Sequence, residues 1–271
     1  MRGNKKKEPI FVAELRINRK PMKRHILALL LTLALKATAG VQPSCNVRVF
    51  SLKDGLASNV ISSMSQTKDQ LMWFSSWNGL NCYDGYTFTT FNDHPAAGNR
   101  TLTTNRMLRI QPSANDNIWC LTYDRQVFLF DRSTCRFTNY SEKVSKLSGM
   151  PFECQRISTL KNGHTWLFSR EENGPCFCID EQQGTIGMLT TENGLLKGGK
   201  VYGVELDDDG REWVCTDGGL TLMGTDLKTS LPYNFICQIG KQVVMATADG
   251  RLGAFNGKAI MPLTTIPQAI G

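Results

Sequence analysis

The stretch MWFSSWNGLNCYDGYTF, residues 72–88, determines how the rest of the chain is interpreted. It holds two tryptophans and two turn dipeptides, Asn78-Gly79 and Asp84-Gly85, between short runs of residues that favour β-strands. Asn-Gly and Asp-Gly favour the positive φ angles of tight hairpins, so each dipeptide predicts a reversal of the chain. The stretch therefore reads as short antiparallel strands joined by two tight turns.

This stretch is one unit of a repeat. Tryptophans recur at spacings of 46, 47 and 47 residues, at Trp73, Trp119, Trp166 and Trp213. A small hydroxyl residue follows each of them three positions later, namely Ser76, Thr122, Ser169 and Thr216. Units of about 40 to 50 residues with four short strands each are typical of a β-propeller, because one such sheet cannot bury both of its faces alone. We therefore predict an all-β fold, a β-propeller of four-stranded antiparallel blades, with the four tryptophans at equivalent positions.

Five repeat units are recognisable, at residues 55–91, 101–140, 150–190, 194–224 and 231–263. In the last unit Val243 stands where a tryptophan is expected, and no segment beyond residue 39 shows the 3.6-residue apolar period of a helix. Residues 47–50 align with the outer strand of the third unit, which leaves one strand without a blade. The ring is therefore expected to need at least one further blade. The alternative is a five-bladed ring with an idle terminal strand.

The first 39 residues have the pattern of an export signal. From Met22, two basic residues precede an apolar run at residues 26–35, and small residues follow at 37 and 39. The apolar run is shorter than the ~20 residues that a membrane-spanning helix needs. We expect the native chain to start at Met22, residues 1–21 to be an upstream extension, and residues 40–271, a partial propeller, to be exported to the periplasm.

The distribution of charge argues against a nucleic-acid partner for this chain. The formal net charge is +7, but residues 1–39 contain ten of the 31 Lys and Arg residues and only two of the 24 Asp and Glu residues. Residues 40–271 are left with 21 basic and 22 acidic residues. A body so close to neutral gives no support to a groove that binds a phosphate backbone.

Neither the cysteines nor the histidines form a recognisable metal or catalytic motif. The nine cysteines include no pair with the spacing of a zinc site, and several flank tryptophans in apolar runs. We expect buried free thiols, with one disulfide as the alternative in an oxidising compartment. His94 and His164 are expected in loops without a catalytic partner, and Asp207-Asp208-Asp209 in a solvated turn. No cofactor, metal site or catalytic residue is therefore predicted.

Residues 55–91 resemble the two-component regulator propeller repeat. The hallmarks are Gly55-Leu56, Asn59, the polar turn Lys68-Asp69, Trp73, Gly79-Leu80 and Tyr83-Asp84-Gly85. Weaker matches extend the resemblance over most of residues 47–263. Such repeats build the periplasmic sensor region of hybrid two-component histidine kinases, which detect oligosaccharides and control genes for polysaccharide use. In that family two seven-bladed propellers precede a β-sandwich, one membrane helix and the kinase domains.

The resemblance implies that this chain is an N-terminal fragment of such a sensor, that its five blades are part of a larger, seven-bladed ring, and that the chain has no enzymatic activity of its own. It implies an oligosaccharide as the ligand, a homodimer for the full-length sensor, and contact with the membrane only through the C-terminal part that follows. The alternative function is a free-standing secreted propeller that acts as a glycan-binding or lyase-type protein. A lyase would need a histidine or a carboxylate group facing the central channel.

Ligand-binding side chains are expected on the face where loops enter the first strands and connect the second strands to the third. The residues predicted there are Trp77, Asn78, Tyr123, Arg125 and Arg170. Trp77 stands outside the repeat spacing, so the fold does not obviously require it. An aromatic ring beside amide and guanidinium groups suits a sugar, which has an apolar ring face and hydroxyl groups. The alternative is that Trp77 packs against the neighbouring blade.

Overall fold

The computed structural model describes residues 47–93, 101–225, 229, 233–255 and 259–265. The chain divides into a unit up to Val49 and a compact body that starts at Phe50. The expected export signal with its start at Met22, as well as Cys45 and His94, lies outside the described residues.

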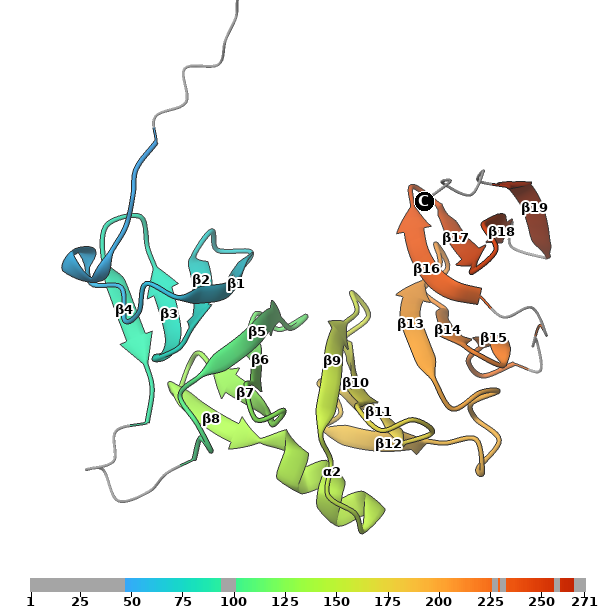
Figure 1. Cartoon of the computed structure of the whole chain (residues 1–271), viewed down its shortest axis with the longest axis horizontal. Coiled ribbons are helices and arrows are strands. Elements are labelled where there is room, and N and C mark those ends of the chain that lie inside the picture. Colours follow the sequence, from blue (N-terminus) through green and yellow to red (C-terminus); the bar gives the residue numbers. More distant parts are fainter. Residues whose placement is uncertain (1–46, 94–100, 226–228, 230–232, 256–258, 266–271) are drawn as a thin grey trace, which may run out of the picture. The chain divides into compact units, whose positions relative to one another are not determined.

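Five antiparallel sheets follow one another along the body, and within each sheet the strands pair in chain order (Figure 1). After a 3-10 turn, η1 (Leu52–Asp54), the first sheet contains β1 (Ile61–Gln66), β2 (Met72–Ser76), β3 (Gly79–Tyr83) and β4 (Phe88–Phe91). The second contains β5 (Met107–Pro112), β6 (Ile118–Thr122), β7 (Val127–Asp131) and β8 (Arg136–Asn139), and the third β9 (Cys154–Thr159), β10 (His164–Ser169), β11 (Cys176–Asp180) and β12 (Thr185–Leu189). The fourth contains β13 (Val201–Leu206), β14 (Glu212–Thr216) and β15 (Gly219–Leu222), and the fifth β16 (Tyr233–Ile239), β17 (Gln242–Thr247), β18 (Arg251–Phe255) and β19 (Ile260–Thr265).

These sheets confirm the predicted propeller blades. The fourth blade shows three strands in the described part of the chain, which excludes residues 226–228 and 230–232. The first strands, β1, β5, β9, β13 and β16, lie on the inner side of the body, and among the described residues the five blades do not close a ring (Figure 1). The surface between the blades that faces inward is therefore built by the first strand of each unit.

The four repeat tryptophans occupy the same place in the second strand of their blades, as predicted. Their partners in the first strand are Ser65, Gln111, Ser158 and Glu205, each at the same distance from the start of its strand. At most 2% of any of these tryptophans is exposed. The buried tryptophans pack against the next blade along the chain: Trp73 lies with Phe130, and Trp213 with Ile236. They thereby fill the space between successive sheets.

In the fifth blade the predicted equivalent of the tryptophans is wrong by one residue. Thr247 pairs with Tyr233 as Thr216 pairs with Val201, so the equivalent position three residues earlier is Val244 and not Val243. The cause is a shorter hairpin, because only two residues separate the paired ends of β16 and β17. Val243 is nevertheless buried in the core of this blade.

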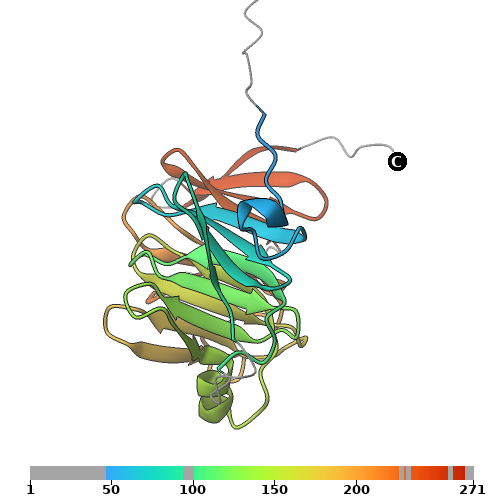
Figure 2. The ribbon, with the colours of Figure 1, turned by 90° about the vertical axis from the view of Figure 1, so that its left-hand side faces the viewer.

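Two further expectations are corrected. A helix, α2 (Tyr140–Ser148), follows β8 where no helix was predicted, and it lies beside β7 and β12 (Figures 1 and 2). Its apolar residues Tyr140, Val144 and Leu147 stand at the i, i+4, i+7 spacing of a helix. At its ends the Asn139 side chain accepts a hydrogen bond from the Glu142 backbone N–H, and Gly149 adopts the left-handed conformation. Residues 47–50, which were expected to be an outer strand, form no strand.

No described helix is long and apolar enough to cross a membrane.

Candidate ligand-binding site

A β-bulge recurs at the same point of every first strand. The pairing with the second strand skips one residue in each blade, namely Ser62, Leu108, Gln155, Tyr202 and Asn234. A bulge leaves one residue unpaired, bends the strand and re-aims a side chain. Four of the five bulge residues, Ser62, Leu108, Gln155 and Tyr202, line the same cavity. The repeat therefore builds a concave inner surface from four consecutive blades.

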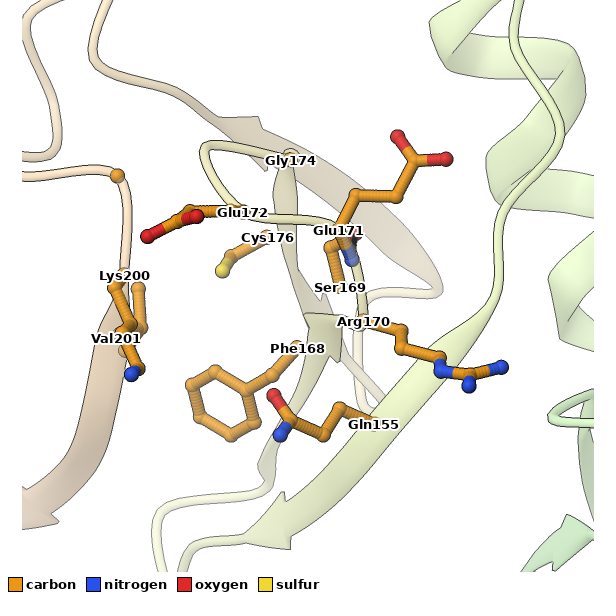
Figure 3. Close-up of a pocket in the computed structure, with 11 residues that line it drawn as sticks. Gln155, Phe168, Ser169, Arg170, Glu171, Glu172, Gly174, Cys176, Lys200 and Val201 are labelled. Carbon is orange, nitrogen blue, oxygen red and sulfur yellow. Dashed lines mark hydrogen bonds between the residues drawn. The ribbon is translucent and has the colours of Figure 1, made fainter.

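This larger cavity has a volume of about 440 Å³. Besides the bulge residues, it is lined by Arg109, Leu121, Arg125, Arg156, Phe168, Lys200 and Val201. A smaller cavity of about 240 Å³ shares Gln155, Phe168, Lys200 and Val201 with it, so the two adjoin. Figure 3 shows the smaller one, with the Phe168 and Gln155 side chains pointing into it. Together the cavities are lined by two aromatic side chains, an amide and several charged groups.

Arg156 of β9 is the most constrained charged group of the larger cavity. Its Nη2 donates a hydrogen bond to the Tyr202 carbonyl oxygen at 2.8 Å, and its guanidinium carbon lies 4.5 Å from the centre of the Phe168 ring. Its buried Nε has no hydrogen-bond partner among the described residues. Burial, and secondly the nearby charge of Arg109, lowers the pKa of Arg156, although a guanidinium remains protonated in proteins. The cation is thus partly desolvated without a counter-charge in contact.

The other basic groups of the larger cavity come from different elements. Arg109 lies on β5, Lys200 immediately precedes β13, and Arg125 lies in the turn after β6 with a positive φ of 65°. The Arg125 carbonyl oxygen accepts a hydrogen bond from the Cys154 backbone N–H at 2.9 Å, which ties this turn to the third blade. In the described part of the chain no Asp or Glu lines the larger cavity. Its lining therefore carries a local excess of positive charge in a body that is nearly neutral.

The structure separates the five sequence-predicted ligand residues. Arg125 lines the larger cavity and Arg170 the smaller one, but the Arg170 guanidinium binds Glu153 at 3.0 Å and points away from the cavity in Figure 3. Trp77, Asn78 and Tyr123 line neither cavity. Trp77 is 47% exposed, with the Arg106 guanidinium 5.2 Å from its ring centre. A role in ligand binding for all five stays a prediction.

Sequence reasoning missed Arg109, Arg156, Gln155 and Phe168. A signal for the first two was present, because each stands ten residues before the tryptophan of its unit, directly after the bulge. Sequence patterns of this kind identify the inner strand, but they do not show that the arginines of neighbouring blades face one space.

The expectation that His164 lies in a loop is wrong. His164 is the first residue of β10, and its Nδ1 lies 2.7 Å from Oε1 of the buried Glu212 in the fourth blade, while its Nε2 lies 3.7 Å from Oδ2 of Asp180. The Cys178 thiol lies beside them. His164, Cys178 and Glu212 form the one cluster of three potential metal ligands among the described residues, and their donor atoms lie within 4.8 Å of one another. His164 lines neither cavity, so its contact with Glu212 serves to join the third and fourth blades.

No model of a known protein family and no curated protein matches the chain. Solved structures do match it. The extracellular domain of a protein described as the hybrid two-component system BT3049 from B. thetaiotaomicron aligns over 80% of this chain and 31% of its own length, with a TM-score of 0.55 and 18% identity. The extracellular domain of the one-component system BT4673 from the same organism aligns over 82% and 34%, with a TM-score of 0.51 and 16% identity. Streptogramin B lyase aligns over 79% and 71%, with a TM-score of 0.50 and 14% identity.

Identities this low show a common fold. The chain spans about a third of the length of these two extracellular domains. These neighbours agree with the resemblance to the two-component regulator propeller repeat that residues 55–91 carry. The chain therefore has the propeller fold that occurs in the extracellular domains of these bacterial one- and two-component systems.

Proposed function

We propose that this chain is a ligand-binding propeller region of an exported sensor and that it binds an oligosaccharide in the two adjoining cavities. The observation that carries the proposal is the recurrent bulge, which brings side chains of four blades into one cavity of about 440 Å³. That volume falls within the range of small-molecule sites, roughly 300–1,000 Å³. The fold shared with extracellular sensor domains supports the same conclusion.

The lining suits a sugar in its chemistry. The Tyr202 ring offers an apolar surface to the C–H side of a pyranose, and the Gln155 amide and the Arg125 guanidinium offer hydrogen bonds to hydroxyl groups. Binding would act as a signal when it is passed to further parts of a longer protein. A periplasmic location, a homodimer and the absence of catalysis belong to this proposal.

Calorimetry with a panel of oligosaccharides, followed by chromatography of the mixture, tests the proposal. We expect heat of binding for at least one oligosaccharide and no new products. Gln155→Ala should weaken that binding about tenfold, because it removes hydrogen bonds at the bulge shared by both cavities. Gln183→Ala, in the exposed turn after β11, is the matched control and should bind as the wild type does.

Two results would contradict the proposal. Cleavage of a glycan would favour the lyase-type alternative, and equal affinity of the Gln155→Ala variant and the wild type would remove the cavities as the site. Trp77→Ala addresses the sequence-based prediction separately. Loss of binding in that variant alone would move the site to the exposed surface around Trp77 and Arg106.

A further inference from the structure

We propose that the larger cavity binds the acidic group, a carboxylate or a sulfate ester, of an anionic oligosaccharide. This inference rests on the proposed function and specifies the class of ligand. The acidic group would lie among Arg109, Arg125, Arg156 and Lys200, which come from three consecutive blades.

The first support is that these four basic side chains gather around one space whose lining holds no described carboxylate, whereas several other basic side chains of the body are paired. Arg132, Arg170, Arg211 and Arg251 each form an ion pair with a carboxylate. None of the four cavity residues does so with any described carboxylate. Four like charges around one space repel one another, and an anion in that space would relieve the repulsion. Because the body as a whole is nearly neutral, the excess of positive charge is specific to the lining of this cavity.

The second support is the state of Arg156. Its guanidinium is packed against the Phe168 ring and is partly removed from water, yet its Nε lacks an acceptor among the described residues. Buried polar groups in folded proteins are nearly always hydrogen-bonded, and a buried charge is normally paired. A guanidinium matches a carboxylate or a sulfate oxygen pair in geometry. An anionic ligand in the cavity would supply the counter-charge that the Arg156 guanidinium lacks, although the buried Nε itself has no exposed surface to offer it.

Glu205 is an acidic residue of the body that interacts electrostatically with Arg156. It lies on β13, half-buried, and burial raises its pKa while the charge of Arg156 opposes that rise. Among the ion pairs of the described residues there is none between Glu205 and Arg156, and Glu205 does not line the larger cavity. It therefore does not occupy the place that the acidic group of the ligand would take.

The smaller cavity indicates what adjoins the acidic unit. Its lining includes Glu171 and Glu172 beside Ser169 and Gln155, and the guanidinium of Arg170 is bound to Glu153. Two carboxylates would repel a second acidic group, whereas hydroxyl groups of a neutral sugar find acceptors and donors there. The preferred ligand is thus an acidic sugar linked to a neutral one, rather than a run of acidic sugars.

Calorimetry on the whole chain with matched ligands tests the inference. The probes are a disaccharide of glucuronic acid and a neutral hexose, the methyl ester of the same disaccharide, and a disaccharide with one sulfate ester. We expect the acid or the sulfate ester to bind at least tenfold more tightly than the methyl ester, and the stronger of the two identifies the acidic group. The affinity of the preferred probe should fall as salt is added.

Variants locate the charge that matters. Arg156→Gln should abolish the preference for the acid over the ester. Arg109→Gln should reduce this preference. Because Arg109 is more exposed than Arg156, the Arg109→Gln variant provides the test if Arg156→Gln does not fold. Arg132→Gln is the control, because Arg132 is paired with Asp69 outside the cavities and should leave the preference unchanged. Equal affinity for acid and ester, or a preference that survives both cavity variants, overturns the inference and leaves the proposed function standing. Failure of every probe and of neutral oligosaccharides overturns both.

Discussion

Single residues show that the repeat preserves packing more strictly than polar contacts. The indole Nε1 of Trp73 donates to Thr67 at 3.2 Å and that of Trp213 to Asp207 at 3.1 Å, and each acceptor stands six residues before its tryptophan. In the third unit Leu160 occupies this position, and the buried Nε1 of Trp166 has no partner among the described residues. The expected solvated turn is therefore wrong for Asp207, which is only 7% exposed.

Replacing Trp213 by Phe should cost more stability than the same change at Trp166. Both side chains are fully buried, so the loss of apolar contact is similar. Only Trp213→Phe also removes a hydrogen bond to a carboxylate, which adds about 1–3 kcal/mol to the free energy lost. Urea unfolding of the two variants measures the difference, and equal losses would show that the bond to Asp207 contributes nothing.

Asp207 should make stability depend on acid pH. Burial raises its pKa, but hydrogen bonds from the Arg211 backbone, the Trp213 indole and the Arg211 side chain outweigh burial, so its pKa lies below 3.8. A lowered pKa in the folded state contributes stability that is complete above the unfolded value and is lost as the pH falls through the folded value. The Asp207→Asn variant should therefore have a lower free energy of unfolding than the wild type at about pH 7, and this difference should become smaller below about pH 4. Unfolding curves measured across this pH range test the prediction. A difference in unfolding free energy that stays constant with pH would show that ionisation of the Asp207 carboxylate does not contribute to stability.

At the scale of elements, the hairpin turns differ in how closely other backbone approaches them. Gly79 and Gly85 both have φ near +100°, which side chains rarely adopt. A Cβ at Gly79 would lie 2.5 Å from the Phe91 carbonyl oxygen, whereas a Cβ at Gly85 would meet nothing within 4 Å. The turn between β2 and β3 is thus packed against the end of β4, and the turn between β3 and β4 is open.

Alanine at these two glycines should separate backbone strain from steric clash. Gly85→Ala is expected to cost about 1–2 kcal/mol, the strain of a left-handed conformation. Gly79→Ala should cost clearly more, because the backbone of β4 has to move as well. Thermal unfolding of both variants tests this, and a similar melting temperature for the two would contradict the packing of Gly79 against β4.

Across the whole molecule, the cysteines report how tightly the blades pack. All eight described cysteines are free thiols, and Cys135 is exposed whereas Cys154 and Cys215 are buried. Burial raises the pKa of both Cys154 and Cys215 to about 12. Since the thiolate is the reactive form, these two groups are doubly protected.

Alkylation of the native protein should therefore label Cys135 quickly, and Cys154 and Cys215 only when blades separate or unfold. Mass spectrometry of the digested protein, with time points in buffer and in urea, gives the rate at each position. Labelling of Cys215 at the rate of Cys135 without denaturant would show that the fourth and fifth blades do not hold together as the structure describes.

The sequence by itself determined the class of fold, the number of units, the strands around each tryptophan and most turns. These features are local and periodic: a tryptophan at a constant spacing and Asn-Gly or Asp-Gly at a reversal act through neighbours in the same hairpin. The register of Trp73, Trp119, Trp166 and Trp213 could therefore be predicted residue by residue. Val243 was misplaced because a shorter hairpin shifts the count. The helix α2 was missed because its apolar spacing, at Tyr140, Val144 and Leu147, extends over only nine residues in the connection between two blades.

Only the tertiary structure decided which side chains share a site. Arg109 and Arg156 lie 47 positions apart and meet because a bulge in each first strand shapes one inner surface. His164 of the third blade contacts Glu212 of the fourth blade, which lies 48 positions later in the chain. Contacts of this kind depend on the packing of one sheet against the next, which the pattern within a single unit does not encode.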